Sequence, residues 1–231
     1  MKKAIVGLLV LALLLVGADI AARLVAERAL ATTLQQRLSL PERPDVSIGG
    51  FSVLVQAVSG TYDEVSVEAR GVPTENVGEL DYLLTFYDID LPLRRLVNQD
   101  VSGTTAGRAT AEVRVSEQTL SDLAGRPIAV SSGQNGQIQL DTTYEIAGSN
   151  VDLQVTAEVQ VAGEQVVIDI QDVGAAGMSV PSSVVGAVSD AVGVSFPLPP
   201  AIRGLTLTDV TAREGAIVLH AEGTNVPLSG S

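Results

Sequence analysis

Strict alternation of apolar and polar residues along Val151–Val161 constrains this chain most. The apolar positions are Val151, Leu153, Val155, Ala157, Val159 and Val161, each separated from the next by a polar residue. A period of two residues is typical of a β-strand with one dry and one wet face. Eleven residues at about 3.3 Å each extend over roughly 36 Å. The chain must therefore build a long sheet with one apolar face.

Similar alternation recurs along most of the chain. Further strands are predicted at Arg108–Val115, Gln137–Ile146, Gln165–Ile170, Leu205–Thr211 and Ala216–Ala221. Short turns at Ala162–Glu164 and Glu214-Gly215 join consecutive strands, and hairpins of this kind produce antiparallel pairs. We therefore predict a mainly β (α+β) fold, with a mostly antiparallel sheet that is curled or closed into a barrel.

The stretch Pro44–Val72 predicts a strand, a sharp corner and a returning strand. Val46 and Ile48 alternate with polar residues, Gly49-Gly50 follows, and Phe51–Val55 is almost entirely apolar. Alternation resumes after Ser59-Gly60. Glycine is common where a sheet bends or reverses.

The pattern changes phase within Glu79–Leu91. Leu80, Tyr82, Leu84 and Phe86 share one face, whereas Tyr87, Ile89 and Leu91 continue the apolar pattern on the other. This change predicts a bulge, or a strand covered on both sides for part of its length.

Helices are predicted at Asp19–Leu40, Glu117–Ala124 and Pro181–Val192. Ser116 and Gly125 suit the two ends of the middle helix. The first helix has Leu30, Leu34 and Leu38 at helical spacing. It is interpreted either as packed on the sheet or as a stalk near a membrane.

The chain begins with a basic and then apolar leader. Lys2 and Lys3 precede Ala4–Ala18, which contains no charge. Fifteen helical residues span about 22 Å, less than the roughly 30 Å of a bilayer core. This favours a signal peptide cleaved after Val16-Gly17-Ala18, and an uncleaved anchor is the alternative. We predict a leader at 1–18 and a single domain at 19–231, starting with a helix at 19–40.

The composition limits the classes of partner. The apolar fraction is 46%, the aromatic fraction is 3%, there is no cysteine and the net charge is −13. A chain this acidic is repelled by phosphate backbones, so nucleic acid is excluded as a partner. It also has no polybasic patch for an anionic lipid surface. Any contact with lipid must therefore be mainly apolar.

Few residues suit catalysis or metal binding. His220 is the only histidine, which excludes a histidine-based metal cluster, and it occupies the polar phase of its predicted strand. Asp88 and Asp90 would lie about 6–7 Å apart on one strand face, as either a carboxylate pair or a solvated patch. We predict no enzyme, no catalytic residue, no metal and no cofactor.

Long alternating strands with aliphatic side chains suit a sheet curled around an apolar lumen. Burying an acyl chain of about 16 carbons at roughly 0.8 kcal/mol per methylene gives on the order of 12 kcal/mol before ordering costs. The same pattern is equally typical of a filled β core, so both interpretations stay open at this point.

The chain resembles the LmeA-like phospholipid-binding proteins of the actinobacterial cell envelope. The likeness is carried by Pro44, Val46, Ile48, Gly50, Phe51, Leu54, Gln56, Gly60, Tyr62, Val65 and Val67, and by Phe196-Pro197-Leu198-Pro199, Gly204-Leu205, Val210, Gly215 and Gly223–Leu228. The chain departs from the family pattern at Ser52-Val53, where Pro-Phe is expected.

The resemblance implies an elongated β-barrel similar to tubular lipid-binding domains, with an apolar interior that holds phospholipid. It implies an exported, non-enzymatic envelope protein on the outer side of the plasma membrane, either anchored or periplasmic. The candidate cavity wall is Phe51, Leu54, Leu84, Phe86, Val113, Val115, Leu140, Tyr144, Val155, Val159, Phe196 and Leu198. The alternative function is a membrane-tethered structural or interaction module that scaffolds envelope assembly.

Overall fold

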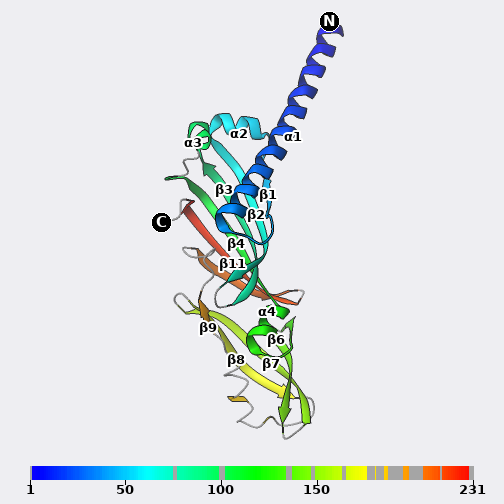
Figure 1. Cartoon of the computed structure of the whole chain (residues 1–231), viewed down its shortest axis with the longest axis vertical. Helices are drawn as coiled ribbons and strands as arrows, with labels where there is room; N and C mark the ends of the chain where they lie inside the picture. The colour runs from blue at the N-terminus through cyan, green and yellow to red at the C-terminus, as the bar shows by residue number, and fades with distance from the viewer. Residues whose placement is uncertain are drawn as a thin grey trace. The chain divides into compact units, whose positions relative to one another are not determined.

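The computed structural model describes residues 2–74, 77–98, 102–133, 137–146, 149–162, 165–175, 180, 185–186, 195–197, 205–213 and 215–228 (Figure 1). Its helices are α1 (Lys2–Leu38), α2 (Val53–Ser59), α3 (Leu93–Val97) and α4 (Glu117–Ala124). Its strands are β1 (Asp45–Ile48), β2 (Thr61–Thr74), β3 (Gly78–Asp90), β4 (Thr105–Ser116), β5 (Ile128–Ser132), β6 (Ile138–Ile146), β7 (Ser149–Ala162), β8 (Gln165–Ala175), β9 (Ser195–Pro197), β10 (Thr206–Ala212) and β11 (Ala216–Pro227).

The strands form two sheets. One has the order β1-β2-β3-β4-β11-β10 and the other the order β5-β6-β7-β8-β9. The pairs β1–β2, β10–β11 and all four pairs of the second sheet are antiparallel, which confirms the predicted mostly antiparallel architecture. Among the described strands neither sheet closes on itself, since each order ends at two different edge strands. Of the two predicted forms, a curled sheet or a closed barrel, the described strands exclude the closed barrel.

The alternating stretch Val151–Val161 forms the predicted strand, as part of β7. Leu153, Val155 and Ala157 in β7 are at most 2% exposed, whereas the alternate residues Asp152 and Gln154 are exposed. β7 pairs with β8 in the predicted hairpin, and β10 pairs with β11 in the last one. The α4 helix has its predicted ends: the hydroxyl of Ser116 accepts from the N–H of Thr119, and Gly125 follows in the left-handed conformation.

Three elements differ from the predictions. The corner after Gly50 is the short helix α2, not extended chain, because the side chain of Ser52 caps it and Gly60 ends it. β5 is a strand at a position where the sequence pattern predicted none. The predicted helix at Asp19–Leu40 is the second half of the long helix α1, which also includes the leader. The predicted helix at Pro181–Val192 falls mostly outside the described residues.

The phase change in β3 is confirmed. Leu80 and Tyr82 are buried on one face, and Ile89 is buried on the other. Asp88 lies between the two phases with a φ of 53°, which is unusual for a non-glycine residue inside a strand. This local irregularity accompanies the change of phase between Tyr82 and Ile89.

The chain divides into two compact units. Unit 1 comprises Met1–Ala69, Leu84–Ala109 and Gly223–Ser231, and unit 2 comprises Arg70–Leu83 and Thr110–Glu222. β2, β3, β4 and β11 each contribute residues to both units. The single domain at 19–231 therefore stays a prediction.

The core of unit 1 lies between its strands, α2 and α1. Its buried residues are Ile48, Val53, Tyr62, Ile89 and Ala106, and Ala26 of α1 packs against them with Val65, Phe86, Leu91 and Leu228. In unit 2, α4 is tied to two hairpins, because Glu117 accepts from Val130 N–H and its own N–H donates to the carbonyl of Gly215.

Candidate functional site

Four of the predicted wall residues belong to unit 1. Phe51 precedes α2 and is 97% exposed, and Leu54 in α2 is 41% exposed. Leu84 and Phe86 in β3 are half-buried, and Phe86 packs against the core of unit 1. The structure therefore places two of these side chains on the surface and two at the margin of the core.

Four of the other eight wall residues are deeply buried in unit 2. Val113 and Val115 on β4, Leu140 on β6 and Val155 on β7 are at most 2% exposed. Leu140 and Val155 are directly opposite each other in the β6–β7 pair. Tyr144 is half-buried, with the guanidinium of Arg126 lying 4.5 Å from the centre of its ring. At these four buried positions of unit 2, the structure thus shows side chains packed against protein.

Three wall residues are described only in part or not at all. Val159 lies in β7 opposite Ile168, and Phe196 lies in β9 opposite Val166. Leu198 falls outside the described residues. The role of the whole set in lipid contact stays a prediction.

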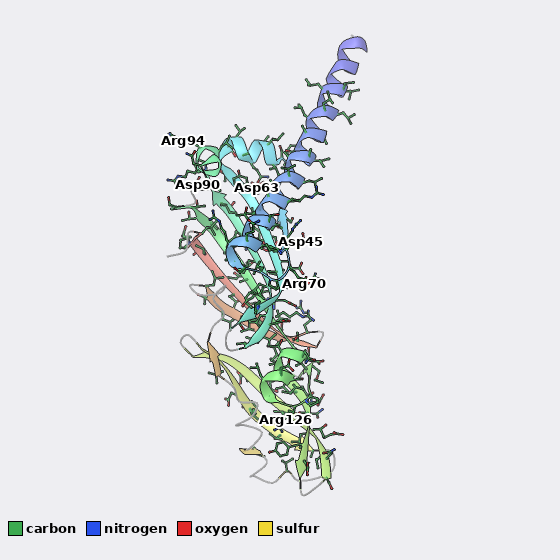
Figure 2. The ribbon with its side chains drawn as sticks, in the orientation of Figure 1. Asp45, Asp63, Arg70, Asp90, Arg94 and Arg126 are labelled. Atoms are coloured by element: carbon green, nitrogen blue, oxygen red, sulfur yellow. The ribbon has the colours of Figure 1, made fainter. Side chains whose placement is uncertain are left out.

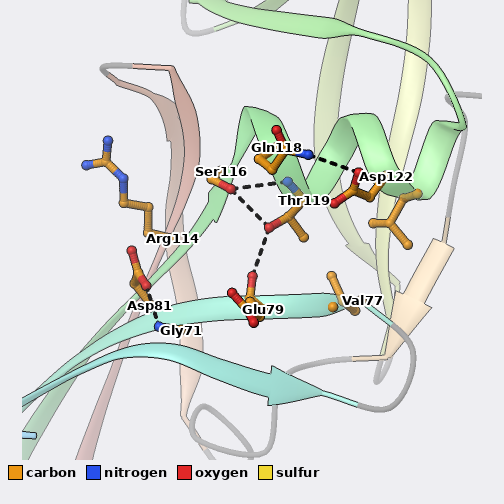
Figure 3. Close-up of a pocket in the computed structure, with 11 residues that line it drawn as sticks. Gly71, Val77, Glu79, Asp81, Arg114, Ser116, Gln118, Thr119 and Asp122 are labelled. Carbon is orange, nitrogen blue, oxygen red and sulfur yellow. Dashed lines mark hydrogen bonds between the residues drawn. The ribbon is translucent and has the colours of Figure 1, made fainter. Parts of the chain in front are cut away.

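A cleft with a volume of about 550 Å³, lined mostly by polar residues, opens in unit 2 (Figure 3). Its lining residues are Gly71, Val77, Gly78, Glu79, Asp81, Arg114, Ser116, Gln118, Thr119, Asp122 and Leu123. The hydroxyl of Thr119 donates to the backbone carbonyl of Glu79 at 2.9 Å, and the amide of Gln118 donates to Asp122 at 3.0 Å. None of the predicted wall residues lines this cleft. Its carboxylates and hydroxyls suit water and polar groups, not an acyl chain.

The helix α2 buries Val53 and Gln56 and exposes apolar side chains on its other face. Gln56 is buried, whereas Val55 and Val58 are 63% and 81% exposed. The amide of Gln56 donates to the carbonyl of Gly49 and accepts from the N–H of Asp63, both at 2.9 Å, so its burial is satisfied. A soluble helix normally turns its apolar stripe inward. We call Phe51, Leu54, Val55 and Val58 the apolar tip.

The carboxylate of Asp19 attaches this tip to α1. Asp19 Oδ1 accepts from the hydroxyl of Ser52 at 2.7 Å and from the N–H of Leu54 at 3.0 Å. One turn further along α1, Arg23 donates to the carbonyl of Gly50 at 2.9 Å. Three hydrogen bonds therefore hold the start of α2 against the part of α1 that follows the leader.

The first half of α1 is apolar and exposed. Leu9, Leu11, Leu13, Leu14, Leu15 and Val16 are 57–74% exposed. Within the described residues, α1 is long and apolar enough to cross a membrane by length and composition, properties that a signal sequence shares. Figure 1 shows this half of the helix continuing away from the strands of unit 1 beyond α2.

The carboxylates and the histidine form no metal site among the described residues. Asp88 and Asp90 are both exposed. His220 is half-buried in β11, with Nδ1 3.6 Å from a carboxylate oxygen of Glu112 and Nε2 3.3 Å from the hydroxyl of Thr211. These contacts tie neighbouring strands together, and no described cavity adjoins His220.

Residues 17–222 match the sequence pattern of the LmeA-like phospholipid-binding proteins. The chain belongs to the LmeA-like phospholipid-binding family. The match confirms the resemblance drawn from the residues, and no enzymatic family is indicated. The comparison with curated proteins finds no match, and neither does the comparison with solved structures.

The LmeA-like match begins at residue 17, just before Asp19, and so includes the attachment of α2 to α1. Ser52, where the chain departs from the family pattern, both caps α2 and donates to Asp19. Sequence reasoning missed Val55, Val58 and this attachment. The available signals were the helical spacing of Phe51, Val55 and Val58 and the capping propensity of Ser52.

Proposed function

We propose that this LmeA-like protein is an exported, membrane-tethered and non-enzymatic phospholipid-binding protein of the cell envelope, whose β-structure holds acyl chains on the outer side of the plasma membrane. The observation that carries the proposal is the family match over residues 17–222. The exposed apolar half of α1 supports a tether, and the excess of acidic residues supports recognition of lipid through its apolar part.

Burial distinguishes the places where an acyl chain can make its first contact. Leu84 and Phe86 are half-buried, so part of each side chain is accessible to a ligand. Val113, Leu140 and Val155 are enclosed by protein. They would contact an acyl chain only if the elements around them separate. We therefore propose β3 near Leu84 and Phe86 as the first acyl contact, and the buried residues of unit 2 as a deeper one.

Photo-crosslinking tests the proposal directly. The full-length chain is incorporated into vesicles of a phospholipid that carries a diazirine on its acyl chain, irradiated and digested, and the peptides are mapped by mass spectrometry. We expect adducts in the peptide that contains Leu84 and Phe86 as well as in α1. Adducts confined to residues 1–18 would show a tether without lipid binding and would favour the tethered scaffold.

Native mass spectrometry of the chain extracted in mild detergent provides an independent measurement. A lipid-binding chain retains phospholipid at a fixed stoichiometry after detergent removal. As a matched control, Asp88→Asn combined with Asp90→Asn should retain the same lipid. Both carboxylates are exposed to solvent, and a charged group is not expected to contact an acyl chain. Loss of lipid in this double variant would contradict recognition through apolar contact.

A further inference from the structure

The apolar tip is positioned by the residue that ends the leader. Asp19 directly follows Ala4–Ala18, and its carboxylate accepts from Ser52 and Leu54 at the start of α2. Whatever depth Asp19 takes relative to a bilayer, α2 takes a similar depth, because the two are joined by direct hydrogen bonds. Figure 1 shows α2 beside α1 at the point where the helix leaves the strands of unit 1.

The length of the leader fixes that depth. Ala4–Ala18 covers about 22 Å as a helix, which is less than the roughly 30 Å of the hydrocarbon core. A span this short is accommodated by thinning of the bilayer and by flanking residues that lie at its surface. Asp19 then lies at the outer interface and not in the water beyond it. Its two hydrogen bonds satisfy the carboxylate there, which lowers the cost of placing a charge near hydrocarbon.

The tip has the chemistry of an interfacial surface. Phe51, Val55 and Val58 project outward at spacings of four and three residues, and α2 contains no charged residue. On α1, Ile20, Leu24 and Val25 are exposed as well. Exposed apolar side chains gathered in this way mark contact with a protein or a membrane. Here the attachment of α2 to the residue that ends the apolar leader selects the membrane.

Charges near the tip are mixed. Figure 2 shows Arg94 with Asp63 and Asp90 at this end of unit 1, and all three residues are exposed. Because this end carries charges of both signs, attraction to anionic headgroups does not explain a membrane contact here, and the apolar side chains of the tip would supply it.

We propose that the apolar tip lies in the outer interface of the same bilayer that holds α1, and that the Asp19 attachment sets the depth of unit 1 at the membrane. This inference rests on the tether in the proposed function and adds a second contact to it. The occupant of the exposed face of α2 is thus the lipid interface next to the anchor, at the boundary between headgroups and acyl chains.

Site-directed spin labelling tests the depth of the tip, since the chain has no cysteine. Single variants Leu13→Cys, Val55→Cys, Val58→Cys and Gln36→Cys of the full-length chain are labelled with a nitroxide and reconstituted in phosphatidylcholine vesicles. All four positions are exposed, and Gln36 lies on α1 about 25 Å beyond Asp19. Intact mass is measured first, and a chain that begins at Asp19 overturns the tether and this inference with it.

The ratio of collisions with oxygen to collisions with a water-soluble nickel chelate reports depth. We expect the highest ratio at Leu13, and ratios at Val55 and Val58 severalfold above that at Gln36. Ratios at Val55 and Val58 equal to that at Gln36, with Leu13 in the bilayer, would overturn this inference alone. An aqueous ratio at Leu13 would overturn the tether itself.

A second pair of variants tests the attachment. Asp19→Ala removes both hydrogen bonds, so the label at Val58 should shift toward the ratio at Gln36. Asp19→Asn keeps an oxygen acceptor and should preserve most of the depth at Val58. An unchanged ratio in Asp19→Ala would overturn the role of Asp19. Circular dichroism of each variant checks that the fold is retained.

Discussion

At the scale of single residues, Gln56 shows how a polar side chain can be essential inside an apolar core. Its amide bridges the carbonyl of Gly49 and the N–H of Asp63, and it is 5% exposed. Leaving a buried backbone group without a partner costs about 1–3 kcal/mol. The amide therefore joins the end of β1 to the start of β2 beneath α2.

Gln56→Leu should lower the free energy of unfolding of unit 1 by about 2–4 kcal/mol, because it leaves two backbone groups without their partner. Gln36→Leu, on an exposed position of α1, should change it by no more than about 0.5 kcal/mol. Urea titration followed by hydrogen exchange at β2 measures both. Equal effects of the two substitutions would show that the bridge contributes no net stability.

Because the phenol of Tyr82 is buried, we expect the folded chain to lose stability at high pH. Burial raises the pKa of Tyr82 to about 12, from an ordinary value near 10. Between about pH 10 and 12 the unfolded chain loses a proton that the folded chain keeps, so stability is complete below pH 10 and falls above it. Burial also raises the pKa of Tyr62, which adds a contribution of the same sign in unit 1.

Tyr82→Phe should therefore flatten the fall in the urea midpoint between pH 10 and 12. It should also remove the last phase of phenolate absorbance in a spectrophotometric titration of the folded chain. A titration whose last phase survives the substitution would contradict a buried Tyr82 phenol.

At the scale of elements, comparing Gly60 with Gly125, which end α2 and α4, distinguishes the cost of backbone strain from the cost of steric crowding. Both glycines are left-handed, with φ of 80° and 65°. A Cβ at Gly60 would lie 2.9 Å from the Cα of Pro92, whereas one at Gly125 would meet nothing within 4 Å. Gly60 also accepts from the N–H of Leu91 at 2.8 Å. The end of α2 therefore fits closely against the chain entering α3.

Gly125→Ala should cost about 1 kcal/mol, the strain of a left-handed alanine. Gly60→Ala should cost about 2–4 kcal/mol, because backbone must also move. Denaturant unfolding of each variant, read separately in unit 1 and unit 2, measures the difference. A similar loss of stability in both variants would show that the backbone near Pro92 moves to accept the added Cβ at little cost.

The elements show which features a sequence pattern can predict. The strands β4 and β7 followed from alternation, because each buries one face on a core. The last two hairpins followed from alternation on both sides of a short turn. The helix α2 was missed because Phe51–Val55 is almost entirely apolar, so it was assigned to a corner between strands, and the helical spacing that Val58 completes was not used. β5 was missed because five residues after a proline carry too short a pattern, and its pairing with β6 decides its conformation.

At the scale of the whole molecule, the candidate lipid-contact residues were only partly predictable from the sequence, because a local pattern reports burial but not the identity of the neighbour. Alternation identifies which side chains turn away from water, as it did for Leu140 and Val155. It does not specify whether protein or lipid lies against them. The attachment of Asp19 to Ser52 joins residues 33 positions apart, and no local pattern reveals such a contact. The family pattern, in contrast, identified the class of protein.

The net charge of −13 predicts an unusual response of membrane binding to salt. An acidic chain is repelled by an anionic bilayer, and salt weakens that repulsion as the screening length falls from about 10 Å at 0.1 M to about 3 Å at 1 M. Apolar burial does not weaken with salt. Association of the detergent-diluted full-length chain with vesicles containing phosphatidylglycerol should therefore increase as salt is raised, whereas association with phosphatidylcholine vesicles should change little.

Flotation of the vesicles on a density gradient measures the bound fraction in each condition. A protein held by basic side chains shows the opposite sign, because salt screens its attraction to anionic lipid. Release of this chain from anionic vesicles at high salt would mean that its few arginines, and not its apolar helix and tip, hold it at the membrane. An increase limited to anionic vesicles would identify repulsion as the effect that salt removes, and would leave apolar contact as the source of binding.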